Sequence, residues 1–374
     1  MSEQSERKEI TLGGQARAFF SLALAVLVGY IAYIGRGVLI PVVIAGFASF
    51  LIYTLKETIK AGPMIGRFLP NWLCYLFAFA VIGSIFLLFI EIIRGNVQSL
   101  ISEAPIYETR LRDLSHDAVA ALHSYGVVPA DLIGGIDELR RTGLSMINPI
   151  LSELGSTVRA LTGNLVTIFL YTVFMLLERG RIFRKINMLS ANAHGRRAVN
   201  ETIADISGMV RQFITVKTVS NLITASGSYA VLRLLGVDFA GFWALLIFVL
   251  NYIPIIGAPL AMTAPALLAL VQPEGGLKTA ALALGCLIAI DQVMSSVVEP
   301  RLIGRSLNLS PLIVLLALAV WGTLWGFAGM VLAVPMTVTL MIILTQFPAT
   351  RPVAILMSDN GDIAPIKHAP PKTL

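Results

Sequence analysis

The chain has 374 residues, of which 56% are hydrophobic and 13% are charged, and its formal net charge is +6. Soluble domains average about 45–50% apolar and about 25% charged residues, so this composition excludes an ordinary soluble protein. The positive charge does not indicate nucleic-acid binding, because the basic residues lie mostly in loops between apolar runs, the pattern that orients membrane proteins. We therefore expect an all-α integral membrane protein whose first partner is the lipid bilayer.

The first 93 residues carry three apolar runs, at about 19–35, 38–55 and 72–93. A helix needs about 20 apolar residues to cross a bilayer core of about 30 Å, and these runs approach that length. The first run leads almost directly into the second without a convincing small-residue cleavage site, so we interpret it as a membrane span rather than a signal peptide. Residues 1–93 are therefore predicted to form N-terminal membrane segments.

Residues 94–157 change in character. Apolar residues such as Val97 and Leu100 recur at helical spacing, with charged residues such as Glu103 and Arg110 between them. This periodicity predicts amphipathic helices outside the bilayer core. Their apolar stripes must pack on each other, on the membrane surface or on another subunit, and we expect a homo-oligomer.

Residues 158–208 contain a fourth apolar run and then the most basic stretch of the chain. The run ends near Leu177, and the basic residues that follow are Arg179, Arg181, Arg184, Lys185, Arg196 and Arg197. Because basic loops stay on the cytoplasmic side, this stretch is predicted to be cytoplasmic. Both termini then also lie inside, and the amphipathic insert lies outside.

Residues 209–346 are predicted to form the transport core, and its first run, at 209–235, is unusually polar. It includes Lys217 and Asn221 together with several serines and threonines. Such polarity in a membrane segment indicates a face toward protein or a water-filled cavity. The alternative is structural, because Ser and Thr also bond to helix carbonyls or join helices.

Two later apolar runs, 239–271 and 309–344, are too long for one straight span and are interrupted near their centres. The first is interrupted by Pro254 and Gly257, and the second by Gly326 and Gly329. Proline removes a backbone donor and glycine permits unusual backbone angles, so both runs should be broken. Paired, interrupted segments in corresponding halves indicate a transporter's binding site.

An offset of 70 residues superposes Pro265 on Pro335, which suggests an internal repeat. Two topologies fit: eight spans, or six spans with two re-entrant hairpins that come from opposite sides. Arg301 and Arg305 are cytoplasmic only in the second topology, so the positive-inside tendency favours the hairpins. Residues 347–374 are polar and proline-rich, and we expect a flexible cytoplasmic tail.

Asp291 is the leading candidate for chemistry, because it lies well inside an apolar run. A charge at that depth costs at least about 2.5–3.5 kcal/mol, so the carboxylate should be protonated, paired or in contact with water. Ser295 and Glu299, four and eight residues on, extend the same helical face. A proton-coupling or substrate role for Asp291 competes with a structural role as the partner of Lys217 or of unwound backbone. Asn251 offers donors and an acceptor to a hydroxylated solute or a cation.

Enzyme motifs are missing from the sequence: it has no Walker sequence, no HExxH and no GxSxG. Its two cysteines lie outside any CxxC pattern, so no metal site, disulfide framework or cofactor is predicted. The lack of a nucleotide motif favours gradient-driven transport over catalysis or ATP-driven transport. A non-transporting membrane scaffold or a channel is the alternative class.

Three segments resemble the autoinducer-2 exporter-like family of bacterial permeases: 251–257, 299–304, and 309–312 running on to 326–335. The resemblance implies an inner-membrane transporter, coupled to protons or sodium, that exports small polar molecules such as autoinducer-2. It also implies sodium/proton antiport as an alternative activity. Where that family commonly carries a glycine–glutamine pair in the fifth run, this sequence has Val216 and Lys217.

Overall fold

The computed structural model describes five residues between 16 and 24, and residues 26–61, 69–124, 163–189, 193–303 and 308–361. Within these ranges the chain is helical, and its one pairing of extended backbone is an isolated bridge between Leu309 and Ser358. Four helical segments are long and apolar enough to cross a membrane: Arg36–Ala61, Asn71–Leu100, Leu277–Leu302 and Pro311–Thr345. The predicted all-helical, multi-pass membrane fold is therefore confirmed at this level.

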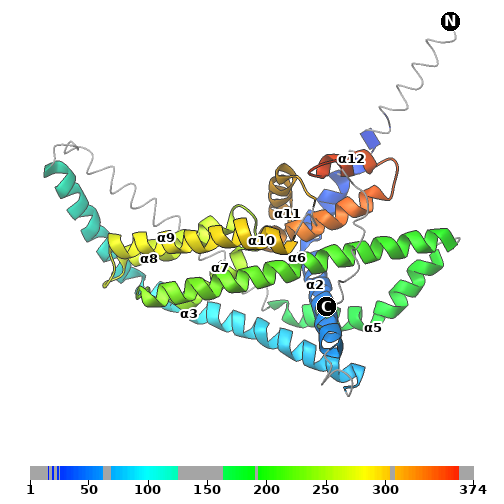
Figure 1. The fold of residues 1–374 in the computed structure, drawn as a ribbon, viewed down its shortest axis with the longest axis horizontal. Helices are drawn as coiled ribbons and strands as arrows, with labels where there is room; N and C mark the ends of the chain where they lie inside the picture. Colours follow the sequence, from blue (N-terminus) through cyan, green and yellow to red (C-terminus); the bar gives the residue numbers. More distant parts are fainter. Residues whose placement is uncertain are drawn as a thin grey trace, which may run out of the picture.

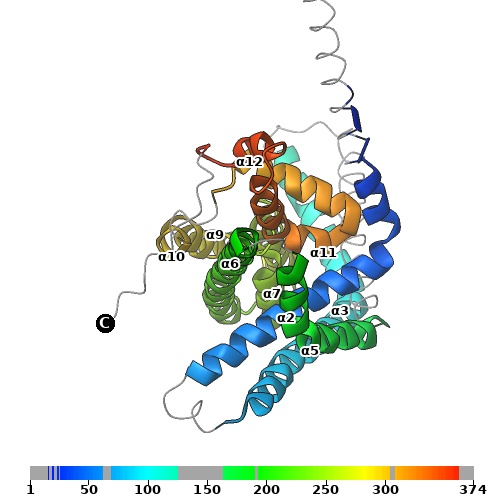
Figure 2. The same ribbon diagram turned by 90° about the vertical axis from the view of Figure 1, so that its right-hand side faces the viewer.

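Helices α2 (Arg36–Ala61), α3 (Asn71–Ser124) and α5 (Leu165–Leu189) make up the N-terminal part. Helix α2 packs against both α3 and α5 (Figure 1), and the rings of Phe79 and Phe169 meet edge to face at 5.2 Å. The helical segment before α2 changes direction at Gly35 (Figure 2), where the chain forms a turn.

Helix α3 is a single helix of 54 residues. At 1.5 Å per residue it is about 80 Å long, more than twice the thickness of a bilayer core. Its apolar part ends near Leu100, so the following residues extend the third membrane segment as an amphipathic arm. The sequence predicts an insert that begins at residue 94, whereas the helix continues without interruption through Ser124. The rest of the predicted insert, 125–157, lies outside the described residues.

Helix α6 (Ala193–Leu234) leads to α7 (Ala240–Leu250) and α8 (Gly257–Val271), which form an antiparallel helical hairpin. Gln272 follows α8, is only 2% exposed, and joins the end of the hairpin to its beginning, which we call the open end. Its Nε2 donates to the carbonyl of Gly236 at 2.8 Å, and its Oε1 accepts from the backbone N–H of Asp238 at 3.1 Å. The first and last residues of the hairpin therefore lie next to each other.

The bend of this first hairpin lies in the segment that the sequence analysis predicted to break. Ile255 adopts a φ of 67°, a costly conformation for a β-branched residue. A Cβ on Gly257 would lie 1.8 Å from the carbonyl oxygen of Leu250, so only glycine fits where the two arms meet. Pro254 cannot donate a backbone hydrogen bond, which favours termination of the helix here.

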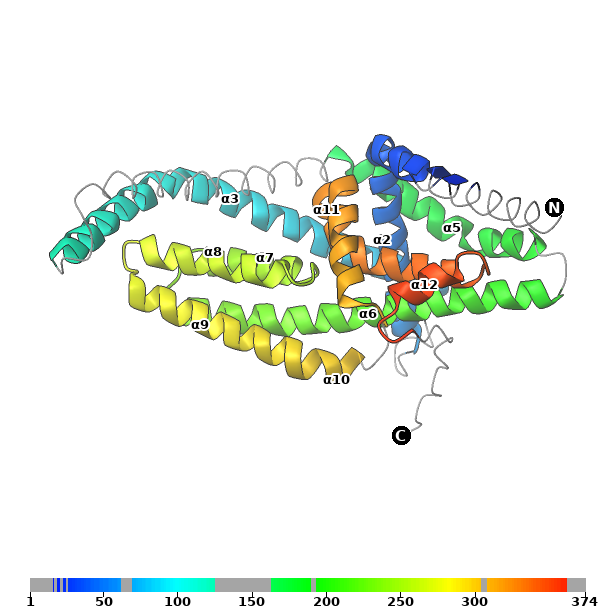
Figure 3. The same cartoon turned by 90° about the horizontal axis from the view of Figure 1, so that it is seen from above.

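Helix α9 (Leu277–Val293) continues through a π-helical turn, η2 (Met294–Val298), into α10 (Glu299–Ile303). Figure 3 shows α6, α7, α8 and α9 running alongside one another, and contacts between α6 and α7, α7 and α8, α8 and α9, and α6 and α9 agree. Most of the buried apolar core lies in and around this group of helices.

Helix α11 (Pro311–Thr345) is bent at Gly326, whose φ of 60° and ψ of −140° are not helical. Its two arms lie together next to the bend, because a Cβ on Gly329 would lie 1.9 Å from the carbonyl oxygen of Trp321. Trp321 Nε1 also donates to Thr337 Oγ1 at 3.1 Å across the arms. The second predicted break is therefore present, with the same close glycine–carbonyl approach as the first.

The second hairpin contacts α6, α12 (Arg351–Met357) and the segment before α2, among other described parts of the chain. Its second arm packs on α6 through Phe213, Val334, Val338 and Ile342. Trp325 beside the bend donates to the carbonyl of Ala32 at 3.2 Å. Helix α12 follows the second arm, and the backbone N–H of Ser310 bonds to the carbonyl of Met357 at 3.0 Å.

Candidate transport site

One face of α6 carries a row of buried polar side chains. Ser220, Asn221, Thr224 and Ser228 are each 1% exposed, whereas Leu222 on another face is 58% exposed. These four side chains therefore face protein, as the first of the two interpretations predicted, whereas Arg211, Gln212 and Ser226 of the same run are exposed. The structural alternative, in which Ser and Thr bond to helix carbonyls, also holds in part, because Thr224 Oγ1 donates to the carbonyl of Ser220 at 3.1 Å.

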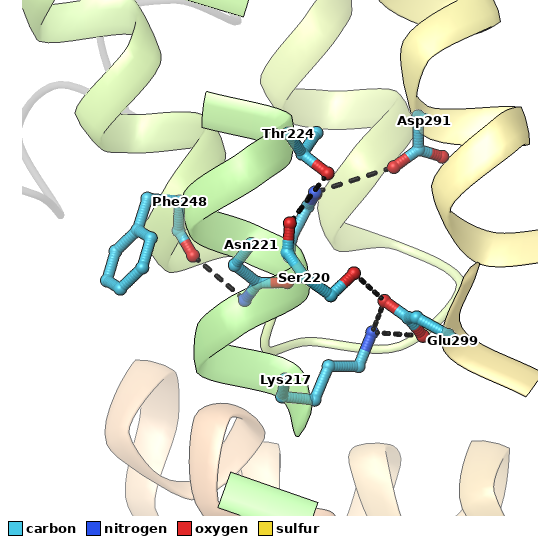
Figure 4. Close-up of polar contacts among 8 residues, drawn as sticks. Lys217, Ser220, Asn221, Thr224, Phe248, Asp291 and Glu299 are labelled. Atoms are coloured by element: carbon cyan, nitrogen blue, oxygen red, sulfur yellow. Dashed lines mark hydrogen bonds and ion pairs between the residues drawn. The ribbon is translucent and has the colours of Figure 1, made fainter. Parts of the chain in front are cut away.

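Lys217 on α6 forms an ion pair with Glu299 at the start of α10. Its Nζ lies 2.9 Å from both carboxylate oxygens, and Ser220 Oγ donates to Oε1 of the same carboxylate at 2.8 Å. The two charged side chains are only 15% and 17% exposed. Figure 4 shows Lys217 and Ser220 pointing toward Glu299 from one helix. Asp291 was one predicted structural partner of Lys217, but the residue that pairs directly with Lys217 is Glu299.

Asp291 lies two turns earlier, on α9, and faces the bend of the first hairpin. Its Oδ1 is 3.4 Å from Nδ2 of Asn251, a long contact drawn as the dashed line to Asp291 in Figure 4. With both carboxylates ionised, this group of Lys217, Glu299 and Asp291 has one more negative than positive charge. Neutral balance there requires one additional positive charge, such as a proton on Asp291 or a bound cation.

Two amide oxygens beside this charge group have no hydrogen-bond partner within the part of the chain that the structure describes. They are Oδ1 of Asn221 and Oδ1 of Asn251, both buried. A buried carbonyl oxygen without a partner is costly, and such atoms usually accept a bond from water or from a ligand. The arrangement can therefore accept hydrogen bonds from hydroxyl groups or coordinate a cation.

The bend of the first hairpin is held against α6 by two further contacts. Asn221 Nδ2 donates to the carbonyl of Phe248 at 3.1 Å, and the hydroxyls of Thr218 and Tyr252 are 2.6 Å apart. The candidate site therefore lies between α6, the bend of the α7–α8 hairpin and the α9–η2–α10 segment. We refer to Lys217, Ser220, Asn221, Asn251, Asp291 and Glu299 as the polar cluster.

The other residues that the sequence proposed for the site do not belong to the polar cluster. Pro254 and Gly257 shape the bend that presents Asn251. Ser295 is exposed and is not part of the polar cluster, although Asp291 and Glu299 on either side of it are. Gly326 and Gly329 form the bend of the second hairpin, near Ala32 rather than in the cluster.

Sequence reasoning did not single out Ser220, Thr224 or Tyr252 as site residues. A usable signal was present for the first two, since residues 217, 220, 221, 224 and 228 follow the i, i+3, i+4, i+7 pattern of one helical face. Tyr252 directly follows Asn251 in the predicted break, but nothing in the sequence indicated Thr218 as its partner.

The sequence also matches known proteins over most of its length. Residues 22–349 match the family described as AI-2E family transporter. The chain belongs to this family. It is 28% identical over 359 residues to the AI-2 transport protein TqsA of Escherichia coli, covering 94% of this chain and 97% of that protein. A putative transport protein of Haemophilus influenzae is 27% identical over 347 residues, covering 92% and 97% of the two chains.

A shorter match supports the same assignment. The putative transport protein YhhT of Escherichia coli is 31% identical over 205 residues, covering 53% of this chain and 56% of YhhT. Membership of the AI-2E transporter family, together with four candidate spans, identifies the chain as a multi-pass membrane protein of a transporter family.

Proposed function

We propose that this protein is a gradient-coupled secondary transporter that exports a small polar solute, such as autoinducer-2, across the bacterial inner membrane. The observation that carries the proposal is the contact between Asn251, in the bend of a broken membrane segment, and Asp291 on the neighbouring helix. Discontinuous membrane helices commonly form the solute and ion sites of secondary transporters.

The donor and acceptor groups of the polar cluster suit a hydroxylated solute. The unpartnered oxygens of Asn221 and Asn251 accept hydrogen bonds from hydroxyl groups, while Lys217 is already neutralised by Glu299. A neutral polyol would therefore bind without leaving a new charge unpaired. Asp291 supplies the charge that a proton or sodium ion balances, which gives a physical route to coupling.

For the topology, we propose six spans and two re-entrant hairpins, with both termini cytoplasmic and residues 209–346 as the transport core. The first hairpin begins and ends at Gly236 and Gln272, which supports a segment that returns to the side from which it came. The second bends in the same way at Gly326. Non-helical backbone at membrane depth is tolerated only when protein or a cavity surrounds it. Asn251, Ile253 and Gly257 of the first bend are buried, as that condition requires, while Ile255 and Ile256 at its tip are exposed.

Sodium/proton antiport is the second candidate, and one observation favours it. A carboxylate beside two amide oxygens is an all-oxygen donor set of the kind that hard cations prefer. In that case the cation would itself be the substrate, and the amide oxygens would bind it directly.

The test is flux into proteoliposomes that contain the purified protein. Autoinducer-2 and sodium ions are offered separately, each with an imposed pH gradient, an imposed sodium gradient or no gradient. Asp291→Asn removes the charge of the candidate site, and Glu274→Gln removes an exposed carboxylate from the connection between α8 and α9 as the matched control.

Saturable autoinducer-2 flux that follows one gradient, and is lost in Asp291→Asn but kept in Glu274→Gln, supports the exporter. Sodium flux driven by a pH gradient without solute supports antiport. Protein that moves neither solute under any gradient, although it is folded and correctly inserted, would overturn the proposal and favour the scaffold alternative.

A further inference from the structure

The ammonium group of Lys217 lies in the chelating position of the Glu299 carboxylate. Its Nζ is 2.9 Å from both Oε1 and Oε2, so it contacts the two oxygens equally. Ser220 Oγ donates to Oε1 at 2.8 Å and helps to orient the carboxylate (Figure 4). An ionised carboxylate only accepts hydrogen bonds, so this position suits a positively charged donor or a bare cation.

A further oxygen lies on the same face of α6. Asn221 follows Lys217 by four residues, and residues at i and i+4 share a helical face. Its Nδ2 bonds to the carbonyl of Phe248. Its Oδ1 is buried and has no hydrogen-bond partner among the described residues. Carboxylate and amide oxygens are the ligands that hard cations prefer, so the donor set around the ammonium group is also that of a cation site.

Burial makes a positive charge at this position necessary. The side chains of Lys217 and Glu299 are only 15% and 17% exposed. A desolvated carboxylate without a counter-charge is strongly destabilising, so the position attracts a cation from solution when the chain does not supply one. Lys217 competes with dissolved cations at a high effective concentration, because it is attached to the same chain. The ammonium group therefore keeps dissolved cations out of this position.

We infer that Lys217 is a tethered cation that fills a monovalent-cation site formed by Glu299 and Asn221. Because the ammonium group is covalently attached, it cannot cross the membrane with the solute, and the site adds no ion to a transport cycle. This consequence rests on the proposed function, in which Asp291 is then the charge left for an ion from solution. Lys217 thereby lowers by one the number of ions that the polar cluster takes up with each solute.

The test asks whether a cation from solution takes the place of the ammonium group when Lys217 is shortened to alanine. The full chain carries Asp291→Asn in every variant, so that residue 291 attracts no ion. Equilibrium unfolding in mixed micelles at pH 8 is followed by tryptophan fluorescence in sodium, potassium or ethylammonium chloride. Choline chloride, whose bulky quaternary cation has no N–H to donate, keeps the ionic strength constant and provides the reference.

Asp291→Asn/Lys217→Ala should be stabilised by at least one of the three small cations. Above the Kd, each tenfold rise in the concentration of that cation should raise the folding equilibrium constant by about tenfold. The effect should be absent from Asp291→Asn alone, where Lys217 fills the site, and should be lost when Glu299→Gln is added to the alanine variant. Asp291→Asn/Arg197→Ala is the matched control, because the carboxylate that it leaves unpaired, Glu201, is 63% exposed.

Stability of the Lys217→Ala protein that is the same in all four salts would overturn the inference. An equal response of the Lys217→Ala and Arg197→Ala proteins would also overturn it, because the cation would then act without the site. Lys217→Gln carries the same comparison if the alanine variant does not fold. The measurement is of unfolding and not of flux, so its failure is distinct from a failure of the proposed transport.

Discussion

Replacing Lys217 by methionine tests how the polar cluster is held together. The variant leaves Glu299 only 17% exposed, with the hydrogen bond from Ser220 but without its counter-charge. Removing one partner of a buried pair costs about 3–5 kcal/mol, because the remaining charge stays desolvated. Since both side chains retain some exposure, we expect the lower part of that range, about 3 kcal/mol. Equilibrium unfolding in mixed micelles, followed by tryptophan fluorescence, measures this loss.

The chain offers a matched control for this prediction. Arg197 and Glu201 form an ion pair with the same 2.9 Å separation, but their side chains are 81% and 63% exposed. Such a pair at i, i+4 contributes only about 0.3–0.5 kcal/mol, so Arg197→Met should change stability little. Adding Glu299→Gln to Lys217→Met removes the orphaned charge and should recover a substantial part of the loss. Equal losses for Lys217→Met and Arg197→Met would refute the reasoning.

Two further predictions concern the hairpins. Gly257→Ala should prevent correct folding of the first hairpin, because its Cβ would lie 1.8 Å from the Leu250 carbonyl oxygen, whereas Gly285→Ala has no atom within 4 Å and should be tolerated. Size-exclusion chromatography of the two purified variants checks this, and a monodisperse, wild-type-like Gly257→Ala protein would contradict it. Gln272→Leu removes both hydrogen bonds at the open end of the first hairpin and should cost about 2–4 kcal/mol in the same unfolding assay, against almost no change for the exposed control Gln346→Leu. Similar stability of these two glutamine variants would show that the open end is held by other contacts.

The breaks in the two long apolar segments were predictable from sequence because their causes are local. Proline at 254 cannot continue the hydrogen-bond ladder, and the glycines at 257, 326 and 329 permit the bends that the structure shows. The polar face of α6 was also accessible from the spacing of its residues, although the sequence alone did not distinguish a functional face from local Ser and Thr bonding to the helix.

The partners within the polar cluster were not predictable in the same way. Lys217 and Glu299 are 82 residues apart, and only the packing of α6 against α10 brings them together. Ser295 was assigned to the face of Asp291 on the assumption of regular α-helix, whereas the segment Met294–Val298 is a π-helical turn and Ser295 is exposed. The uninterrupted helix from Asn71 to Ser124 was missed because its change from apolar to amphipathic sequence resembled a boundary.

The central claim is that Asp291 couples a gradient to solute movement rather than simply supporting the fold. One measurement separates these roles: solute exchange at equal concentrations and gradient-driven accumulation, compared in the same proteoliposomes for wild type, Asp291→Asn and Glu274→Gln. If Asp291 carries the coupling charge, Asp291→Asn retains exchange and loses accumulation against a gradient, while Glu274→Gln retains both. Accumulation by Asp291→Asn at the wild-type level would contradict the account.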